Sequence, residues 1–362
     1  MFDIAIIGAG INGCAVAYEL REEKKSVALF DMGGVANGGS GAAGAFISPK
    51  FSKAGELKEL LHNAFVYSMA FYEEHFASEL IKAPLLHLAK DETDAAMLQA
   101  YKASTDLELI EHENESREYV SINTGLVDAS GVCEAMSRSA QLIQEEVISL
   151  RYDDGVWVIN ESYSAKKILL ATGAYKKLID EPYLKLRGVW GHRIDVASTT
   201  HNPFSIHQFV SISPSHNGKL AIGATHNVHY HPQTATEPYD INAGREELLD
   251  KAAQTLLLED VKVIKDYTGL RSGSFDYIPL LGRLVASKET LQNNQINFKV
   301  KRADYSEYSY YPNLYIINGS GGYGFVLAPY LARILKEHLL LGQEIPKMFH
   351  PARFFARWAK RH

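Results

Sequence analysis

The first thirty-one residues contain the feature that most constrains how this chain can fold. Asp3–Ile7 is an apolar, β-branched run, typical of a strand buried on both faces. Gly8, Gly10 and Gly13 follow directly in the spacing G-x-G-x-x-G, before a helical pattern and a second strand that ends in Asp31. Such glycines permit a tight turn, the approach of a pyrophosphate to the backbone, and close packing of helix on strand. This order of elements predicts a dinucleotide-binding unit.

The acid at the end of the second strand indicates which dinucleotide is bound. Asp31 lies 23 residues after Gly8, near the roughly 20 expected for an acceptor of a ribose 2′-hydroxyl. An acid there favours an unphosphorylated ribose, as in FAD or NAD, over NADP. The helix N-terminus adds free N–H groups and a positive dipole end for the phosphates. The residues expected to bind the nucleotide here are Gly8, Gly10, Ile11, Asn12, Gly13, Asp31 and Met32.

Length and composition indicate a folded, two-domain protein. The 362 residues suffice for two domains and a large core. With 46% hydrophobic and 22% charged residues, the composition is that of an ordinary globular chain. A net charge of −6 argues against a protein that coats nucleic acid non-specifically, although it leaves room for a local basic patch.

The two cysteines and the chain's first residues predict a cytoplasmic location. Cys14 and Cys133 lack metal-binding spacing. Cys14 lies on the first predicted helix, where we expect it to be a small buried apolar residue. We expect no disulfide framework, which fits a reducing cytoplasm. The N-terminus shows neither a basic n-region nor an apolar h-region. No uncharged apolar stretch reaches the ~18 residues of a membrane span, so we expect a soluble protein with no membrane contact.

A second glycine-rich segment follows the nucleotide-binding unit. Residues 32–46 hold six glycines, so their backbone can approach a ligand closely. The alternative is a flexible linker, which would be unusual inside a nucleotide-binding unit. Beyond it, helical spacing from Leu57 to Phe65 and amphipathic stretches between Ala54 and Ile110 predict an inserted helical region.

The middle of the chain alternates helix and strand patterns. We expect a helix over Val132–Leu142, with Ser130 as its N-cap. Strands over Glu146–Tyr152 and Val156–Asn160 are joined by an Asp-Asp-Gly hairpin signal. Lys167–Ala174 is a buried strand ending in small residues, which suits either a nucleotide contact or an ordinary tight turn.

From Gly188 to His231 the pattern changes to short, alternating, aromatic strands. This predicts an antiparallel sheet in a second domain. No pair of its histidines has the i, i+4 spacing of a helical zinc site, so we expect sheet and loop residues and no metal. These histidines are His192, His201, His207, His216, His226, His229 and His231.

A third glycine-rich turn lies near the C-terminus. The strand Leu314–Asn318 leads into Gly319–Gly324 and then into a helix containing Leu331 and Leu335. Two helix N-termini bordered by glycine suit one long ligand that touches both ends of the chain. FAD is such a ligand, whereas NAD on a single Rossmann unit would leave the C-terminal motif without a role.

Together these segments resemble the D-amino-acid-oxidase-like FAD oxidoreductases over nearly the full chain. The resemblance implies an α/β fold: an FAD-binding, Rossmann-like, doubly wound domain with an inserted antiparallel-sheet (α+β) substrate domain. We expect the FAD-binding domain over 1–60, 125–187 and 265–362, and the substrate domain over 61–124 and 188–264. The matching motifs are Gly8–Asp31, Gly38–Gly44, Gly125–Asp128, Ala171–Gly173, Gly269–Gly282 and Gly319–Pro329.

Within that family the chain is most similar to the FAD-dependent half of MnmC-type enzymes, which modify the wobble uridine of tRNA. The similarity lies in Gly39–Pro49, Arg187–His192, Thr268–Arg271 with Asp276 and Pro279, and the basic tail Pro351–Arg361. Since no cysteine follows Cys133, where a sarcosine-oxidase-type linkage would lie, FAD is expected to be non-covalent. Further cofactor-binding residues implied by the resemblance are Gly39, Ser40, Gly41, Ala42, Gly44, Ala45, Val147, Ala171, Thr172, Gly173, Arg271, Gly321, Gly322, Tyr323, Gly324 and Phe325.

The implied reaction removes a hydride from a C–H beside an amine, and water hydrolyses the resulting imine. The flavin performs the hard step while the protein orients the substrate. Arg271 occupies the family position for a planar cation that binds a substrate carboxylate, although a structural ion pair is the alternative. Tyr323 either lines the substrate cavity or packs on the flavin ring. His226 and Tyr267 are further catalytic-site candidates.

Three functions are compatible with these residues. In the MnmC-like interpretation, the enzyme converts carboxymethylaminomethyl-uridine in a tRNA anticodon to aminomethyl-uridine and releases glyoxylate. The alternative enzyme is a small-molecule amine or amino-acid oxidase or dehydrogenase, similar to glycine oxidase or D-amino-acid dehydrogenase. A non-enzymatic flavoprotein module is the third. The tail from Arg353 to Arg361 suits either RNA contact or a basic aromatic helix packed on the domain.

Overall fold

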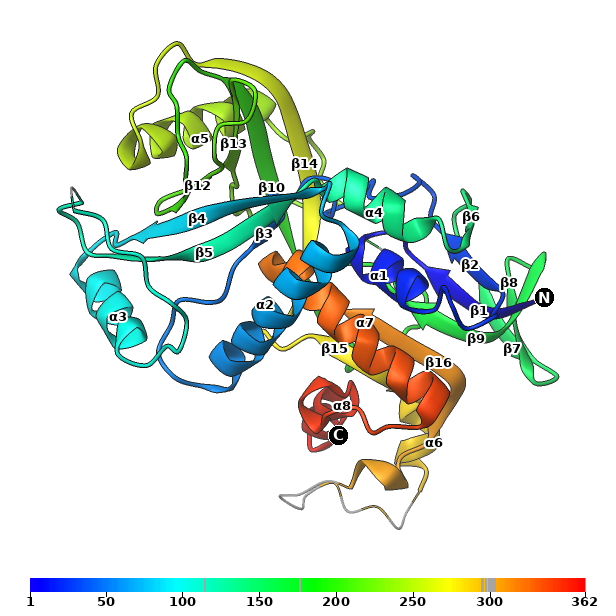
Figure 1. Cartoon of the computed structure of the whole chain (residues 1–362). Helices are drawn as coiled ribbons and strands as arrows, with labels where there is room; N and C mark the ends of the chain where they lie inside the picture. The colour runs from blue at the N-terminus through cyan, green and yellow to red at the C-terminus, as the bar shows by residue number, and fades with distance from the viewer. Residues whose placement is uncertain (114, 176, 294–295, 297, 299–303, 362) are drawn as a thin grey trace.

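Two eight-stranded sheets organise the computed structural model of the chain. It describes residues 1–113, 115–175, 177–293, 296, 298 and 304–361. Figure 1 shows the sheets beside one another, with the N-terminal strand and the C-terminal helix both on the side of the first sheet. Among these described residues, no helix is long and apolar enough to cross a membrane.

The first sheet has the doubly wound order predicted for a dinucleotide-binding domain. Strands β6, β2, β1, β9 and β16 are parallel neighbours, and the strand order reverses between β1 and β9. Ligands bind at such a switch point, beyond the carboxyl ends of the strands. β15 joins one edge antiparallel to β16, and the predicted hairpin, β7 and β8, extends from β9. The strands are β1 Phe2–Ile7, β2 Val27–Phe30, β6 Gln141–Ile143, β7 Leu150–Asp153, β8 Val156–Ile159, β9 Tyr163–Leu170, β15 Leu280–Val285 and β16 Tyr310–Asn318.

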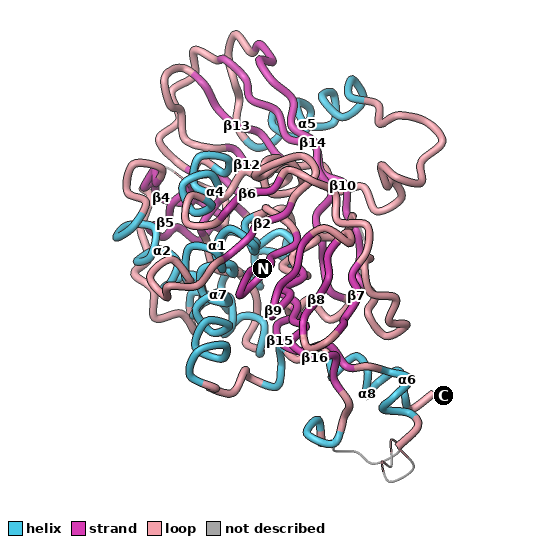
Figure 2. Tube along the Cα trace, turned by 90° about the vertical axis from the view of Figure 1, so that its right-hand side faces the viewer, coloured by secondary structure: helices cyan, strands magenta, loops and turns pink. Residues whose placement is uncertain are grey.

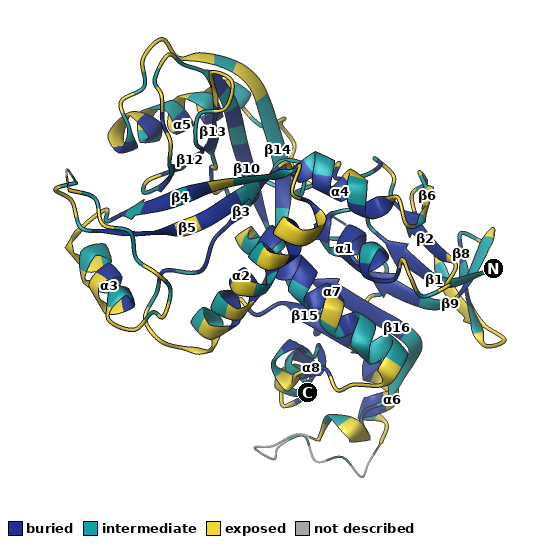
Figure 3. Cartoon of the chain, viewed as in Figure 1, coloured by how far each residue is buried: buried dark blue, intermediate teal, exposed yellow. Residues whose placement is uncertain are grey.

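Alternate residues of the first sheet support two separate cores. Ile4 and Ile6 of β1 face a cluster that contains the helices α1 (Ile11–Glu19), α2 (Glu56–His75), α4 (Ala129–Ser137) and α7 (Gly324–Leu341). Ala5 and Ile7 face the other side, where α8 (Ala352–Ala359) packs. This follows from the alternation of side chains along a strand. Figure 3 shows the strands between these layers as largely buried.

Helix α2 is fixed to α7 by polar as well as apolar contacts. The Ser68 hydroxyl donates to the Val326 carbonyl at 2.7 Å, and the Tyr72 hydroxyl donates to the Phe325 carbonyl at 2.9 Å. Phe325 and Val326 lie in the first turn of α7, directly after the C-terminal glycine turn. The helix α2 therefore helps to place the start of α7, although it lies far from it in sequence.

The second sheet covers the carboxyl side of the first and is mostly antiparallel. Its order is β14-β10-β13-β12-β11-β4-β5-β3, with one parallel pair, β11 and β4. Helix α5 (Ile241–Thr255) packs on β10 and β13 through Leu248 and Ala252. Figure 2 shows α5 and the long strands β10 and β14 in a view at right angles to Figure 1. The strands are β3 Phe46–Ile47, β4 Leu80–Leu88, β5 Tyr119–Val127, β10 Leu186–Ala197, β11 Ser205–His207, β12 Ser211–Ile212, β13 Lys219–Gly223 and β14 Lys262–Ser274.

The remaining helices lie at the periphery. α3 (Glu92–Lys102) follows β4, and the short α6 (Ser287–Leu291) follows β15. Three single turns of 3₁₀ helix complete the described elements. They are Tyr305–Glu307, Gly321–Tyr323 and Lys347–Phe349.

Several local predictions were wrong. Leu80–Leu88 is a strand within the region predicted to be helical, because β4 pairs along its whole length with β5. The helix predicted over 132–142 is α4, which ends at Ser137 and is capped by the side chain of Asp128 rather than Ser130. The second sheet is not wholly antiparallel. The predicted domain boundaries at 60/61 and 264/265 fall inside α2 and β14.

Candidate functional site

A cleft of about 530 Å³ separates the two sheets at the switch point of the first. Its walls come from the three glycine-rich turns on one side and from the second sheet on the other. Most residues predicted to bind the cofactor lie along this cleft. They are Gly8, Gly10, Ile11, Asn12, Asp31, Gly39, Ser40, Ala42, Gly44, Ala45, Ala171, Thr172, Gly173, Arg271, Gly321, Gly322, Tyr323, Gly324 and Phe325.

The first glycine turn allows no larger side chain at two positions. Gly8 has a φ of +113°, and a Cβ there would lie 2.3 Å from the Ala171 carbonyl oxygen. A Cβ on Gly13 would lie 2.0 Å from the Gly8 carbonyl oxygen. The N-terminus of α1 carries no side-chain cap at Gly10. The turn therefore brings bare backbone and a helix dipole to the cleft, which is how pyrophosphates are bound.

Asp31 and Ser40 organise the backbone around this turn. The Asp31 carboxylate accepts hydrogen bonds from the N–H groups of Ala9 and Gly33, each at 2.9 Å. The N–H of Ile11, in the first turn of α1, donates to the Ser40 hydroxyl at 2.9 Å. The glycine-rich loop is thus tied to the helix that would bind phosphate.

That loop also packs directly on the second sheet. A Cβ on Gly39 would lie 2.6 Å from the Leu270 carbonyl oxygen, and one on Gly269 would lie 2.9 Å from the Gly39 Cα. The loop and β14 therefore touch backbone to backbone. This contact, together with its place on the cleft wall, supports a ligand-lining loop over a linker.

The C-terminal glycine turn meets the first one. The Asn12 side chain donates to the Ser320 hydroxyl at 3.3 Å, and the Asn318 amide donates to the Gly173 carbonyl at 2.9 Å. A Cβ built on Gly321 or Gly322 meets nothing within 4 Å, so the turn is open toward the cleft. The N-terminus of α7 also lacks a side-chain cap. Two open helix N-termini on one cleft fit a long ligand with a pyrophosphate and a second anionic end.

Arg271 extends from β14 into the cleft. Its Nη2 donates to the Thr225 carbonyl at 3.0 Å, and its Nη1 lies 3.4 Å from His226 Nδ1. Gly191 makes room for the guanidinium, since a Cβ there would lie 2.4 Å from Nη2. Burial lowers the pKa of Arg271, and no carboxylate of the described residues counters this shift. The predicted alternative, a structural ion pair, is thus not found among them.

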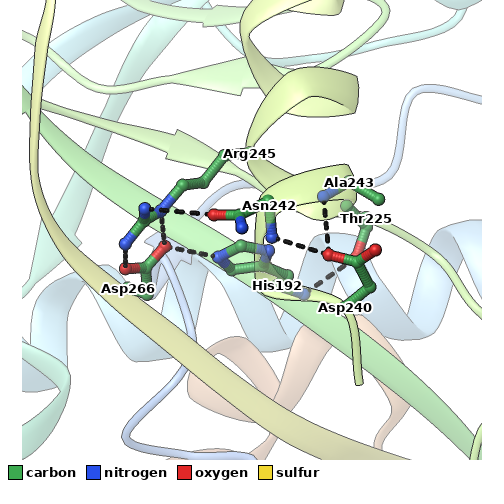
Figure 4. Close-up of polar contacts among 7 residues, drawn as sticks. All are labelled: His192, Thr225, Asp240, Asn242, Ala243, Arg245 and Asp266. Atoms are coloured by element: carbon green, nitrogen blue, oxygen red, sulfur yellow. Dashed lines mark hydrogen bonds and ion pairs between the residues drawn. The ribbon is translucent and has the colours of Figure 1, made fainter. Parts of the chain in front are cut away.

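A polar network behind the cleft holds the carbonyl that Arg271 contacts (Figure 4). Thr225 is bound to His192 through two hydrogen bonds of 2.9 Å, from the His192 N–H to the Thr225 hydroxyl and from the Thr225 N–H to the His192 carbonyl. His192 is fully buried, and its Nε2 lies 2.9 Å from the Asp266 carboxylate. Asp266 in turn accepts from Arg245 of α5 at 2.8 Å, which lowers the Asp266 pKa. Helix α5 is thereby connected to the position of Arg271.

Tyr323 and Lys50 lie on the opposite wall of the cleft. Burial raises the pKa of Tyr323 to about 12, so its hydroxyl stays protonated at neutral pH. Lys50, which follows β3, places its Nζ 5.9 Å from the centre of the Tyr323 ring, within cation–π range. Lys50 was not predicted from the sequence, since it lies four residues beyond the glycine-rich segment 32–46.

This geometry agrees with the comparison to known families. A model of the FAD-dependent oxidoreductases (DAO) matches residues 3–338. The chain belongs to this family. The cofactor of the oxidoreductase is FAD. Cys14 and Cys133 are both buried and neither lines the cleft, which agrees with the non-covalent attachment predicted from the sequence.

Two groups of curated proteins are similar to this oxidoreductase. MnmC from Legionella pneumophila (strain Corby), described as a bifunctional protein of tRNA 5-methylaminomethyl-2-thiouridine biosynthesis, is 24% identical over 97% of this chain and 57% of its own length. Glycine oxidase from Bacillus licheniformis is 24% identical over 78% of this chain and 84% of its own. The chain thus spans little more than half the length of the MnmC protein.

Solved structures show the same fold. Glycine oxidase from Geobacillus kaustophilus superposes with a TM-score of 0.75 at 20% identity, covering 98% of this chain and 97% of that one. Iminodiacetate oxidase from Chelativorans sp. BNC1 superposes with a TM-score of 0.72 at 19% identity, covering 96% and 98%. These neighbours confirm the predicted combination of a Rossmann-like domain with a second sheet.

Several predicted cofactor residues of the oxidoreductase lie outside the cleft lining. Gly13 and Gly41 serve the turns, since a Cβ on Gly41 would lie 2.1 Å from the Ala36 carbonyl oxygen. Met32 is 63% exposed, and Val147 is buried in the core beneath the sheet.

Two predicted catalytic candidates also lie off the cleft lining. Tyr267 donates its hydroxyl to Asp195 at 3.0 Å and is covered by Arg193, whose guanidinium carbon lies 3.9 Å from the ring centre. His226 is exposed beside Arg271, where it contacts the guanidinium rather than the cleft. Neither residue lines the cleft.

The basic tail forms the packed helix α8. Arg353 binds the Asp276 carboxylate with two hydrogen bonds, at 2.9 and 3.0 Å, and also three backbone carbonyls. Phe354 and Phe355 are buried in the core under the first sheet. These three side chains therefore make structural contacts. Three other cations of the tail are exposed, namely Arg357, Lys360 and Arg361.

Proposed function

We propose that the oxidoreductase oxidises the C–N bond of a glycine unit carried by an amine. Its proposed substrate is the carboxymethylaminomethyl-uridine at the wobble position of tRNA. The observation that carries the proposal is Arg271, a half-buried guanidinium at the cleft that lacks a carboxylate partner among the described residues. A planar, charge-assisted pair with the carboxylate of the glycine unit supplies that partner.

The residues at the cleft would perform binding and positioning. Arg271 would hold the carboxylate and so direct the adjacent CH₂ toward the glycine turns of the cofactor wall. The cations Arg271 and Lys50 disfavour a further positive charge, which keeps the substrate amine neutral, as hydride loss requires. FAD, when bound, supplies the acceptor for that hydride. The amine lone pair then forms an imine, and water cleaves it to glyoxylate and the aminomethyl-uridine.

The extent of similarity supports the tRNA substrate. The Legionella MnmC protein is similar over 97% of the chain, whereas the Bacillus licheniformis glycine oxidase is similar over 78%. The exposed cations Arg357, Lys360 and Arg361 supply groups for phosphate contacts.

A small-molecule amine or amino acid is the second candidate substrate. The glycine oxidase of Geobacillus kaustophilus covers 98% of this chain by structure. In addition, Phe354 and Phe355 of the tail are buried and cannot stack on bases. Both substrates present the same glycine unit to Arg271.

Anaerobic bleaching of the oxidised flavin band separates the two. Glycine, N-methylglycine and D-alanine would be compared with tRNA that bears carboxymethylaminomethyl-uridine. The same tRNA without the carboxymethylaminomethyl group is the control. The proposal predicts bleaching by the modified tRNA alone or far faster than by any amino acid, with one glyoxylate released per flavin reduced. Bleaching by free amino acids together with indifference to the tRNA would overturn the tRNA substrate.

The predicted cytoplasmic location is likewise a proposal. Cys14 and Cys133 interact with each other in the core and are both free thiols. Two neighbouring thiols that stay reduced are typical of a reducing compartment. Fractionation of the producing cells would test it.

A further inference from the structure

A row of residues crosses the cleft-facing side of the second sheet from one end of the cleft to the other. Arg193 pairs with Gly223, Gly223 with Ser211, Ser211 with His207, and His207 with His87, on five neighbouring strands. All five line the cleft. Directly paired residues point to the same face of a sheet, and four strand spacings of about 4.8 Å span roughly 19 Å. The floor of the cleft is therefore long compared with a glycine unit.

The two ends of this row differ in chemistry. At one end the neighbouring strand β14 supplies the cation Arg271, whereas Arg193 is bound to Asp195 at 3.2 Å and lies against Gly223. At the other end His87 and His207 stand side by side, with their ring centres 6.2 Å apart. The carboxylate proposed above belongs at the cationic end, so a group attached to the amine would extend toward the histidines.

The histidine end has hydrogen-bonding capacity that the protein does not use. His87 Nδ1 and His207 Nε2 are buried and have no partner among the described residues. Buried polar groups are usually paired, and leaving one unpaired is costly. Phe51 packs on His87 at 4.9 Å and Phe46 on His207 at 5.0 Å between ring centres, so both imidazoles are held in place by aromatic neighbours.

The charge state of these histidines selects the kind of ligand. Burial lowers the pKa of His87 to about 4 and that of His207 to about 3, so both rings are neutral at physiological pH. A neutral imidazole offers one N–H donor and one acceptor nitrogen. This pair therefore suits a neutral group with both donors and acceptors better than a second carboxylate.

We propose that His87 and His207, flanked by Phe46 and Phe51, form a subsite for a planar heterocycle with neighbouring N–H and C=O groups, such as a uracil ring. The heterocycle is attached to the amine whose carboxylate binds Arg271. This subsite rests on the proposed function, because it names the substituent that the oxidised glycine unit carries. It explains how a cleft shared with glycine-oxidising relatives would select a modified nucleoside.

The test compares two glycine units that differ only in their substituent. Anaerobic flavin reduction gives the rate constant of reduction divided by Kd for the nucleoside 5-carboxymethylaminomethyluridine and for N-methylglycine, and the ratio of these two values is the readout. In His87→Leu and in His207→Leu we expect this ratio to fall by about tenfold, the loss of one hydrogen bond in a buried site. His207→Gln, which keeps a donor and an acceptor, should recover part of it.

His112→Leu is the matched control. His112 is a half-buried histidine of the same domain that contacts Ser121 at 2.8 Å and does not line the cleft. Its ratio should equal that of the unmodified enzyme. An unchanged ratio in both His87→Leu and His207→Leu would overturn the subsite.

A binding measurement separates this inference from the proposed function. Calorimetric titration of the FAD-loaded protein with 5-aminomethyluridine, which has no glycine unit, reports on the subsite without turnover. Tenfold weaker binding in both leucine variants supports the subsite, whether or not a glycine unit reduces the flavin. Failure of every glycine unit to reduce the flavin would overturn only the proposed function. Equal or absent binding in all proteins, beside rapid oxidation of N-methylglycine, would overturn the subsite alone.

Discussion

Gly39 is the residue at which the cofactor loop and the second sheet are closest. We predict that Gly39→Ala lowers the retention of FAD and the melting temperature, because its Cβ would lie 2.6 Å from the Leu270 carbonyl oxygen and backbone on one side must move. Overpacking of this kind costs about 1–3 kcal/mol. FAD content after gel filtration and thermal unfolding measure both effects.

Gly273, on the strand β14 that Gly39 contacts, is the control for that substitution. A Cβ there would meet its nearest atom, the Arg187 carbonyl oxygen, at 3.9 Å, and its φ is not positive. Gly273→Ala should therefore retain FAD and stability. Equal behaviour of the two variants would show that the loop does not depend on this backbone contact.

His87 and His207 also predict how stability depends on pH. Their folded pKa values, about 4 and about 3, lie below the ordinary value of 6.5, chiefly because burial disfavours the charged ring. Their contribution to the free energy of unfolding is fully present above pH 6.5 and is lost as the pH falls toward 4, because the unfolded chain binds protons more readily than the folded one. Each histidine contributes a slope of about 1.4 kcal/mol per pH unit within that window.

Thermal unfolding between pH 7 and pH 4.5 checks this dependence. The melting temperature of the unmodified protein should fall more steeply on acidification than that of His207→Leu, which lacks one of the titrating groups. Parallel curves for the two proteins would show that His207 is not held neutral in the fold.

At the level of elements, local patterns predicted the cofactor side well and the second sheet poorly. The strand, glycine turn and helix at the N-terminus are encoded within thirty-one residues, and β1, α1 and β2 lie where predicted. β4 was missed because it contains Pro84, does not alternate regularly, and pairs with β11 more than a hundred residues later. Such pairing depends on distant sequence and leaves no local signal.

The same reason explains which site residues could be predicted. Arg271 lies in a recognisable motif, and its place at the cleft follows from that resemblance. The pairing of His87 with His207 is visible only in the sheet register. Thr225 contributes through its backbone carbonyl, which no side-chain pattern reveals.

The contact between α5 and β14 gives a prediction at this scale. Asp266→Asn removes the ion pair with Arg245 and weakens the contact with His192, so the Thr225 carbonyl that positions Arg271 is held less firmly. We expect KM for a glycine-unit substrate to rise about five- to tenfold with little change in kcat. Stability should fall by about 1–3 kcal/mol.

Steady-state kinetics on Asp266→Asn distinguish positioning from a merely structural role. Glu161→Gln breaks an exposed ion pair with Arg151 and is the control, since such pairs contribute little. A lower melting temperature with unchanged KM would mean that Asp266 supports the fold but not the site.

At the scale of the whole molecule, the two sheets divide the chemistry between them. The first sheet and its three glycine turns hold the cofactor wall, while the second supplies Arg271 and the row that ends at His87. Helix α8 closes the far side of the first sheet through Arg353 and Asp276. The function proposed above requires both walls, and Arg271 is the point where a substrate carboxylate would join them.

The most direct test of this account is a comparison of carboxylate and amide substrates in two proteins. Anaerobic flavin reduction would be measured with N-methylglycine and with N-methylglycinamide, in the unmodified enzyme and in Arg271→Met. A hydrogen bond to a charged group contributes about 1.5–3 kcal/mol, so the unmodified enzyme should prefer the carboxylate by roughly ten- to a hundredfold, with each tenfold step equal to about 1.4 kcal/mol. In Arg271→Met that preference should disappear. An equal preference in both proteins would contradict the assignment of Arg271 as the carboxylate-binding residue.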